Sequence, residues 1–223
     1  SDALKSFKGF DQDAAIRQVK TYELKLAMHR GQYADAKTFV EGALKDGETV
    51  KVIYNNDGGD NPLYSAIGPN SRDVQVNPSL EAVRTTDAEK KALPLAHASV
   101  DKKNPNRYNI YASGLTRKGS MIISNDDDIH LIKAELIVRG VMTGDAMTEV
   151  NKVIGKYDTA SQLSTTPTLA QITELRRIFL AFRGERTADI RRGLEQSSAA
   201  TTWANRKIKW LPIPEKELQS QGL

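Results

Sequence analysis

The spacing of apolar residues predicts helices towards both ends of the chain and irregular structure between them. In residues 11–44, apolar side chains recur at intervals of four, three and four, which predicts one buried face of a helix that begins at Asp11. These side chains are Ala15, Val19, Tyr22 and Leu26. Gly31 is placed to end this helix in the left-handed conformation. A second helix is predicted over residues 33–44, and the short turn makes the two an antiparallel pair.

Residues 45–120 are predicted to form a long irregular excursion, because turn-forming Gly, Pro, Asn and Asp interrupt them repeatedly. Residues 50–54 are rich in β-formers and are expected to be a short strand or an extended segment. A short helix is predicted over residues 78–84. So long a stretch with little regular structure usually carries function or is disordered.

The helical period returns in residues 127–192 and predicts two further pairs, over residues 127–156 and 168–193. The second of these pairs ends at Gly193. Pro212 and Pro214 exclude helix from the last stretch and favour an extended strip over residues 203–218, flanked by Trp203 and Trp210. Four aromatic residues on the periodic faces are predicted core positions: Tyr22, Tyr33, Phe179 and Phe182.

Composition excludes several classes of protein. The 223 residues contain no cysteine, which rules out a disulfide scaffold, a thiolate zinc site and a cysteine nucleophile. No apolar run is long enough to span a bilayer. The net charge is only +4, and acidic residues interleave with the basic clusters, so we expect no nucleic-acid partner.

Two segments of the chain repeat each other. Arg30-Gly31, followed by Ala36 and Val40, aligns with Arg139-Gly140, followed by Ala146 and Val150, with one residue inserted in the second turn. A small residue where paired helices meet, with larger apolar residues after it, is typical of a packed helical hairpin. The spacing of Gly31, Tyr33 and Ala36 is similar to the second helix of a tetratricopeptide repeat.

Three motifs in order resemble the SusD/RagB family. Residues 175–192, LRRIFLAFRGERTADIRR, resemble its Arg-Arg-x-x-Leu-Ala-Phe-Glu-Gly-x-Arg motif with the following Asp-Leu-Arg-Arg. Residues 211–218, LPIPEKEL, resemble its closing Leu-Pro-Ile-Pro-x-x-Glu phrase, and residues 128–135, DIHLIKAE, its middle helix. The family usually has glutamate at the positions of Phe179 and Arg183, and bulky aromatics at those of Thr187 and Ala188. We therefore expect a divergent member whose last helix pair packs less aromatic surface.

This resemblance implies one all-α domain over residues 1–223, a tetratricopeptide-like α-α superhelix with a long irregular loop-rich excursion. It also implies a non-catalytic protein that binds an oligosaccharide or other nutrient at the extracellular face of the cell outer membrane. Such proteins act with a TonB-dependent transporter and are held by a lipidated cysteine, which would lie upstream of this chain. The alternative is a tetratricopeptide-like scaffold that binds a peptide or protein partner on its concave face, without a sugar.

Candidate ligand-binding residues lie in the excursion, where the resemblance also places ligand contacts. Sugar rings stack on tyrosine, while amide and guanidinium groups satisfy their hydroxyls. The candidates are Asn61, Tyr64, Arg72, Tyr108, Asn109 and Tyr111. For the tyrosines, the other interpretation is that they anchor long loops onto the helices.

The sequence offers no catalytic or metal constellation, and we expect neither an enzyme nor a cofactor. His29, His97 and His130 lack metal-ligand spacing, and no serine lies in a Gly-x-Ser-x-Gly elbow. Residues 125–128 (Asn-Asp-Asp-Asp) lack the spacing of a calcium loop and directly precede a helix, which favours N-capping. Asp189 is expected to pair with Arg186 or Arg192 across one helical turn, in a structural role.

Overall fold

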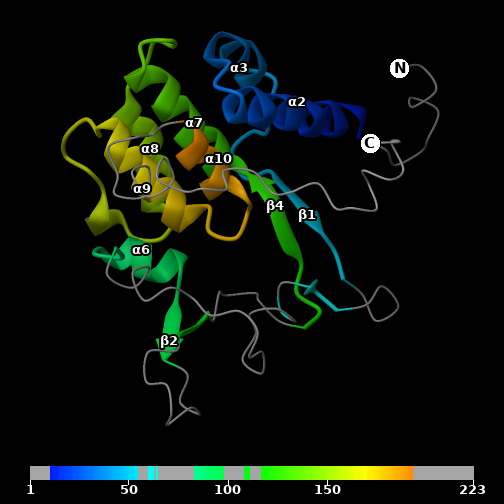
Figure 1. The fold of residues 1–223 in the computed structure, drawn as a ribbon, viewed down its shortest axis with the longest axis vertical. Helices are drawn as coiled ribbons and strands as arrows, with labels where there is room; N and C mark the ends of the chain where they lie inside the picture. Colours follow the sequence, from blue (N-terminus) through cyan, green and yellow to red (C-terminus); the bar gives the residue numbers. More distant parts are fainter. Residues whose placement is uncertain are drawn as a thin grey trace, which may run out of the picture.

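The computed structural model describes residues 11–54, 60–62, 64, 83–97, 108–110 and 117–192, with the backbone alone for 95–97, 108–110 and 191. This part of the chain is mostly helical, in agreement with the all-α prediction, with two short antiparallel ribbons added (Figure 1). The predicted helix at 78–84, Gly193 and the strip at 203–218 lie outside the described residues. No helix in the described ranges combines the length and the apolar character that crossing a membrane requires.

The first helix pair forms as predicted at its turn. Helix α2 (Gln12–His29) begins after Asp11, whose side chain accepts a hydrogen bond from the backbone N–H of Ala14 at 2.9 Å. It ends at His29, and Gly31 just beyond it has φ +70°, a conformation that glycine adopts without strain. Helix α3 (Tyr33–Val40) packs against α2.

Helix α3 is shorter than the prediction, which extended it to residue 44. After Val40 the chain tightens, because the N–H of Gly42 bonds the carbonyl of Phe39 and the N–H of Ala43 bonds that of Val40. Glycine at position 42 lowers the helix propensity there. Ala43 and Leu44 are nevertheless buried, as the apolar pattern predicted.

The predicted inner face of α2 is wrong. Val19, Tyr22 and Leu26 are 56%, 47% and 49% exposed, and the buried side of the helix carries Leu24 and Met28 together with three further residues: Thr21, Lys25 and Ala27. Helix α2 has two faces with apolar residues. The buried face includes Lys25, and a search for hydrophobic periodicity disfavours a face that contains a lysine.

A two-stranded ribbon joins the start of the excursion to the next helix. Strand β1 (Thr49–Val52) pairs antiparallel with β4 (Met121–Asn125), and the register shifts between Val50 and Lys51. Residues 50–54 were expected to be either a strand or an extended segment, and strand β1 confirms the strand over residues 50–52. The 45–120 segment is therefore not irregular throughout, and its two ends lie side by side in Figure 1.

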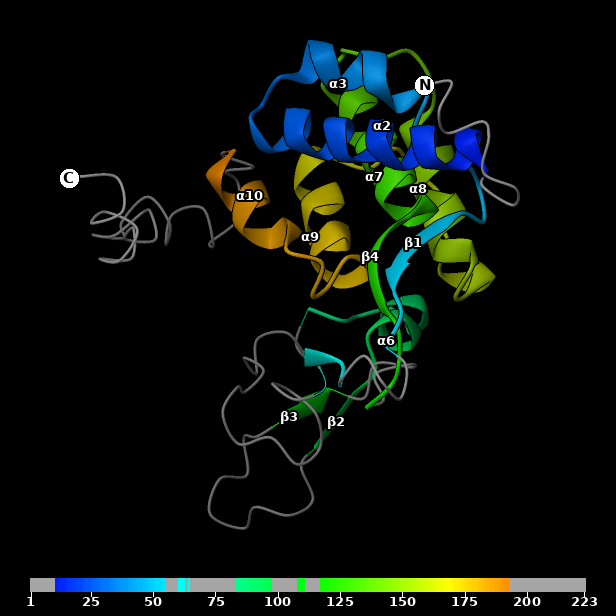
Figure 2. The same ribbon diagram turned by 90° about the vertical axis from the view of Figure 1, so that its right-hand side faces the viewer.

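Helix α7 (Asp126–Val138) follows β4 directly and is the centre of the fold. It is buried almost all round: Ile129, Ile132 and Leu136 pack with α2 and α3, while Leu131 and Ala134 pack with α8 and α9. Its position between two apolar clusters explains why both helix pairs share one body (Figures 1 and 2).

Helix α8 (Ala146–Gly155) completes the second pair and confirms the repeat. Arg139 and Gly140 end α7 with the same geometry as Arg30 and Gly31, since Gly140 has φ +71°. In both turns, the N–H after the glycine bonds a carbonyl five residues earlier, at 2.9 Å. The aligned pairs Ala36/Ala146 and Val40/Val150 are buried in both copies.

The last described pair is built differently. After the 3₁₀ turn η1 (Thr159–Ser161), α9 (Leu169–Phe179) and α10 (Glu185–Arg191) are joined by residues 180–184. In this turn Gly184 has φ +82° and Phe182 has φ +66°, a strained value for a bulky residue. Phe179 is buried as predicted, whereas Phe182 is 40% exposed because the turn directs it outwards; Tyr33 is partly buried.

Short elements of the excursion lie at one end of the helical body (Figure 2). Helix α6 (Asp87–Ala92) begins with a capping box between Thr86 and Glu89 and packs against α9. Strands β2 (Leu95–His97) and β3 (Tyr108–Ile110) form the second ribbon, in which His97 lies opposite Tyr108 and Ala96 opposite Asn109.

Candidate functional site

The predicted ligand-binding residues are only partly described. Asn61 and Tyr64 lie near the start of the excursion, and Tyr108 and Asn109 lie in β3, where only their backbone is described. The remaining two, Arg72 and Tyr111, lie outside the described residues. The structure therefore brings Asn61 and Tyr64 together, and the contribution of the other four to one site stays a prediction.

Asn61 closes the base of the excursion. Its backbone N–H donates to the carbonyl of Arg117 and its Nδ2 donates to the carbonyl of Gly119, both at 2.9 Å. Its Oδ1 accepts from the N–H of Tyr64 at 3.4 Å, and only 1% of the residue is exposed. Beside it, Asp60 accepts from Arg117 at 2.7 Å. Asn61 thus holds two distant segments together and positions Tyr64, which is half-buried.

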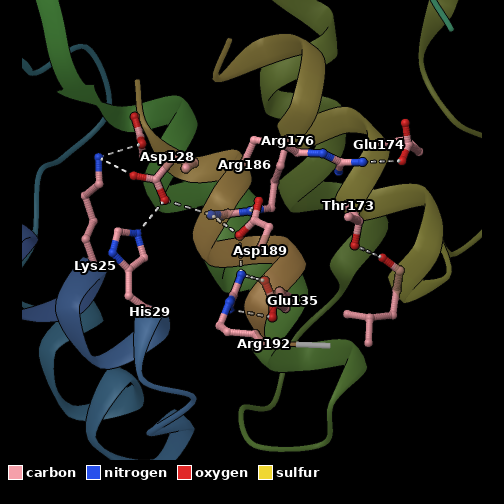
Figure 3. Close-up of polar contacts among 12 residues, drawn as sticks. Lys25, His29, Asp128, Glu135, Thr173, Glu174, Arg176, Arg186, Asp189 and Arg192 are labelled. Carbon is pink, nitrogen blue, oxygen red and sulfur yellow. Dashed lines mark hydrogen bonds and ion pairs between the residues drawn. The ribbon is translucent and has the colours of Figure 1, made fainter. Parts of the chain in front are cut away.

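A network of buried charges joins α2, α7, α9 and α10 (Figure 3). At its centre is Arg176 on α9, whose side chain has no exposed surface. Arg176 donates to Asp189 through Nε and Nη2 at 2.9 and 3.1 Å, and to Glu185 through Nη2 at 3.1 Å. A bidentate arginine–carboxylate pair is the strongest form of this contact, and here it locks α10 onto α9.

Two more arginines connect this network to α7. Arg192 donates to both oxygens of Glu135, at 2.9 and 3.3 Å, and also contacts Asp189, which confirms one of the two predicted pairings. Arg186, the other predicted partner, contacts Glu174 at 3.4 Å instead. Arg183 donates to Asp128 at 2.6 Å.

Helix α2 joins the network through its buried lysine. Lys25 Nζ lies 2.8 Å from Glu185 and 3.3 Å from Asp128, and His29 Nε2 lies 3.1 Å from Glu185. Burial by itself would raise the pKa of Glu185, but the contact with His29 and the charges of Arg176 and Lys25 outweigh it and hold the pKa well below its usual range. Glu185 on α10 is therefore an acceptor that α2 and α9 share, through Lys25, His29 and Arg176.

The acidic run at residues 125–128 caps α7, as predicted. Asn125 Oδ1 accepts from the N–H of Asp127 at 3.2 Å, and Asp128 accepts from the N–H of Asn125 at 3.0 Å. A basic side chain also contacts this run, since Lys156 Nζ lies 2.7 Å from Asp126 and 2.6 Å from Asp127. Within the described ranges, no group of three or more acidic or histidine side chains is arranged to hold a metal ion.

His130 is a buried histidine between two carboxylates. Its Nδ1 lies 2.6 Å from Glu149 and its Nε2 lies 3.1 Å from Asp46. Burial by itself would raise the pKa of Glu149, but hydrogen bonds from His130 and Lys152 lower it to about 2. The pair of His130 and Glu149 joins α7 to α8.

A cavity of about 340 Å³ opens where α9 meets α10. The 180–184 turn supplies apolar walls, and three arginines line the space. A cavity of this volume is large enough for a small ligand. The sequence pattern favoured a structural role for the arginine-rich motif. The cavity was not expected from that pattern, and residues of the 180–184 turn line it together with the arginines.

No protein-family model, curated protein or solved structure matches this chain.

Proposed function

We propose that the chain is a non-catalytic, SusD/RagB-like protein that binds a glycan for uptake. The observation that carries this proposal is that two of the motifs that resemble the family, residues 128–135 and 175–192, are in direct contact. Asp128 and Glu135, the first and last residues of the middle-helix motif, accept hydrogen bonds from Arg183 and Arg192 of the 175–192 motif. These pairs join residues more than fifty positions apart in the sequence. Such contacts support the view that the two motifs belong to one family domain and do not resemble the family by chance.

The repeated hairpins support the finer statement about architecture. Two helix pairs with the same glycine-ended turn, packed through a shared central helix, are the unit from which a tetratricopeptide-like superhelix is built. We therefore propose a superhelix as the frame. The third pair, α9 and α10, continues it with a different turn.

The ligand site is proposed in the excursion, at the end of the body where α6, β2 and β3 lie. Asn61 anchors the described base of this segment through its bonds to the carbonyls of Arg117 and Gly119. The TonB-dependent transporter and the place at the extracellular face of the outer membrane follow from the resemblance and are part of the same proposal. The chemistry proposed is stacking of sugar rings on tyrosine, without bond cleavage.

A glycan-array screen of the purified chain, followed by titration calorimetry with the best oligosaccharide, tests this proposal. Substituting Tyr64, Tyr108 or Tyr111 singly by alanine should weaken binding about fivefold or more wherever the ring stacks on sugar. Tyr22→Ala is the matched control, since it removes a half-exposed tyrosine on the far helix pair. Absence of any glycan ligand, or an affinity equal to that of the unmodified chain in all three variants, would refute the proposed site.

The exposed stripe on α2 favours the alternative, a scaffold that binds a peptide or protein partner. Val19, Tyr22 and Leu26 present adjacent apolar surface on a helix whose other side is buried. An apolar helix face of this kind is what a partner helix recognises. The triple replacement of these residues by serine should abolish co-purification of a protein partner while leaving glycan binding unchanged. If a protein partner still co-purifies with the triple variant, the alternative is wrong.

A further inference from the structure

Helix α2 carries apolar side chains on two sides, and the fold of one chain covers only one of them. Leu24 and Met28 pack in the cluster shared with α3 and α7, at one edge of the described helical body (Figures 1 and 2). The other side carries four residues that each keep between 47% and 56% of their surface exposed, here called the α2 stripe: Ile16, Val19, Tyr22 and Leu26. A helix with apolar residues on both sides is ordinarily buried on both, so the α2 stripe is suited to a partner.

The spacing along this side of α2 is that of a coiled-coil seam. Apolar residues recur at intervals of four, three and four, which is the spacing of positions a and d in a heptad repeat. They are Ala15, Val19, Tyr22 and Leu26, and Ile16 flanks them. A seam of this width packs against one facing helix whose apolar residues have the same spacing. Helix α2 of a second copy meets this requirement, because its sequence is the same.

The charges at the two ends of α2 favour a second copy that runs antiparallel. Asp11 and Asp13 lie at the start of the helix, Arg30 follows its last residue, and all three are exposed. His29 is already paired with Glu185 and is not counted. In an antiparallel pair, the acidic end of each helix lies level with the basic end of the other, whereas a parallel pair brings like charges together.

The sizes of the side chains fit the same arrangement. When a two-fold axis passes midway between Val19 and Tyr22, Val19 of one copy lies level with Tyr22 of the other, and Ala15 lies level with Leu26. Each smaller residue thus faces a larger one, and alternation of this kind lets two facing layers of side chains interdigitate. The α2 stripe is therefore complementary to itself in both size and charge.

We propose that this chain forms a two-fold symmetric dimer in which the α2 stripes of two copies pack antiparallel. A patch that complements itself about a two-fold axis closes the assembly at two copies. A standard interface buries about 800 Å² of each partner, and the four side chains of the α2 stripe supply only part of that area. The dimer is therefore reversible, with a dissociation constant of about 10–100 μM. It does not depend on the proposed glycan site, and it places a second copy where the scaffold alternative places a foreign protein.

Sedimentation equilibrium of the purified full chain at about 1–500 μM tests the dimer. Leu26→Ser should raise the dissociation constant at least about tenfold, because a substitution at a two-fold interface removes two side chains. Ile53→Ser is the control, since it removes an isoleucine that is 69% exposed outside α2, and it should leave the constant unchanged. Melting curves of dilute samples establish that each variant is folded. If the chain stays monomeric at about 500 μM, associates beyond a dimer, or dimerises equally in both variants, the proposal is wrong.

Distances between spin labels test the antiparallel arrangement. The chain has no cysteine, so Gln18→Cys and Gln32→Cys each carry one label per chain and leave every charge in place. At 1.5 Å per residue, the two labels of an antiparallel dimer are offset along the helix by about 8 Å at position 18 and by about 28 Å or more at position 32. Electron–electron resonance should therefore give a distance about 10 Å or more longer at position 32. Equal distances would show a parallel pair, and a foreign protein on the α2 stripe of a monomeric chain would show another occupant; either result overturns the proposal.

Discussion

Replacing Asp189 by asparagine tests whether the buried network holds the last helix pair in place. Asp189 is 1% exposed and accepts two hydrogen bonds from Arg176, at 2.9 and 3.1 Å, besides its contact with Arg192. Asparagine keeps the shape but removes the charge that two buried arginines face. Removing one partner of a buried ion pair typically costs about 3–5 kcal/mol, because the other charge is left uncompensated.

Urea unfolding followed by circular dichroism measures this loss directly. The free energy of unfolding of Asp189→Asn should fall by about 3–5 kcal/mol with an unchanged denaturant slope. Asp87→Asn is the control, since its side chain is 73% exposed and its pair with Lys90 should contribute no more than about 0.5 kcal/mol. A double-mutant cycle with Arg192→Gln should give a coupling of about 1–3 kcal/mol. A loss below about 1 kcal/mol for Asp189→Asn would refute the reasoning, because water would then be solvating the arginines.

Three further predictions concern pH, the repeat and the buried face of α2. The pKa of Glu149 lies at about 2 in the folded chain and at 4.5 ordinarily, so its charged form stabilises the fold above pH 4.5 by about 3 kcal/mol, and this is lost as pH falls from 4.5 to 2. In Glu149→Gln, the free energy of unfolding should depend less on pH over that range. The same pH dependence in the variant and the unmodified chain would contradict the prediction. Gly31→Ala and Gly140→Ala should each cost about 1 kcal/mol in urea unfolding, because both glycines have φ near +70°; unequal losses would argue against equivalent turns. Leu24→Ala should cost about 2–5 kcal/mol and Leu26→Ala less than about 1 kcal/mol, and the reverse order would restore the face predicted from the sequence.

The features predicted correctly from the sequence are those that depend only on residues close together along the chain. Asp11 caps α2, Asn125 caps α7, and Gly31 and Gly140 end their helices, because each bonding partner lies within about five residues along the chain. The repeat was visible for the same reason, since both copies need the same turn and the same small residue where the helices meet.

The bonding partners of the candidate residues could not be predicted from the sequence. Asn61 was proposed to contact a sugar, but its side chain bonds a carbonyl 58 residues away, and nothing in the local sequence indicates that partner. The cavity between α9 and α10 was not predicted at all. Its only local signal was an arginine-rich motif around a glycine, and such a motif is usually a salt-bridged surface.

The sequence by itself determined the caps of α2 and α7, the glycines that follow these helices and which hairpin is repeated, although it did not determine the end of α3. The tertiary structure alone decided which face of α2 is buried and which charges are paired. Lys25 is buried because Asp128, 103 residues further along the chain, and Glu185 surround its ammonium group. Burial of a charge is unfavourable unless a partner compensates it, and that partner is brought into place only by the fold.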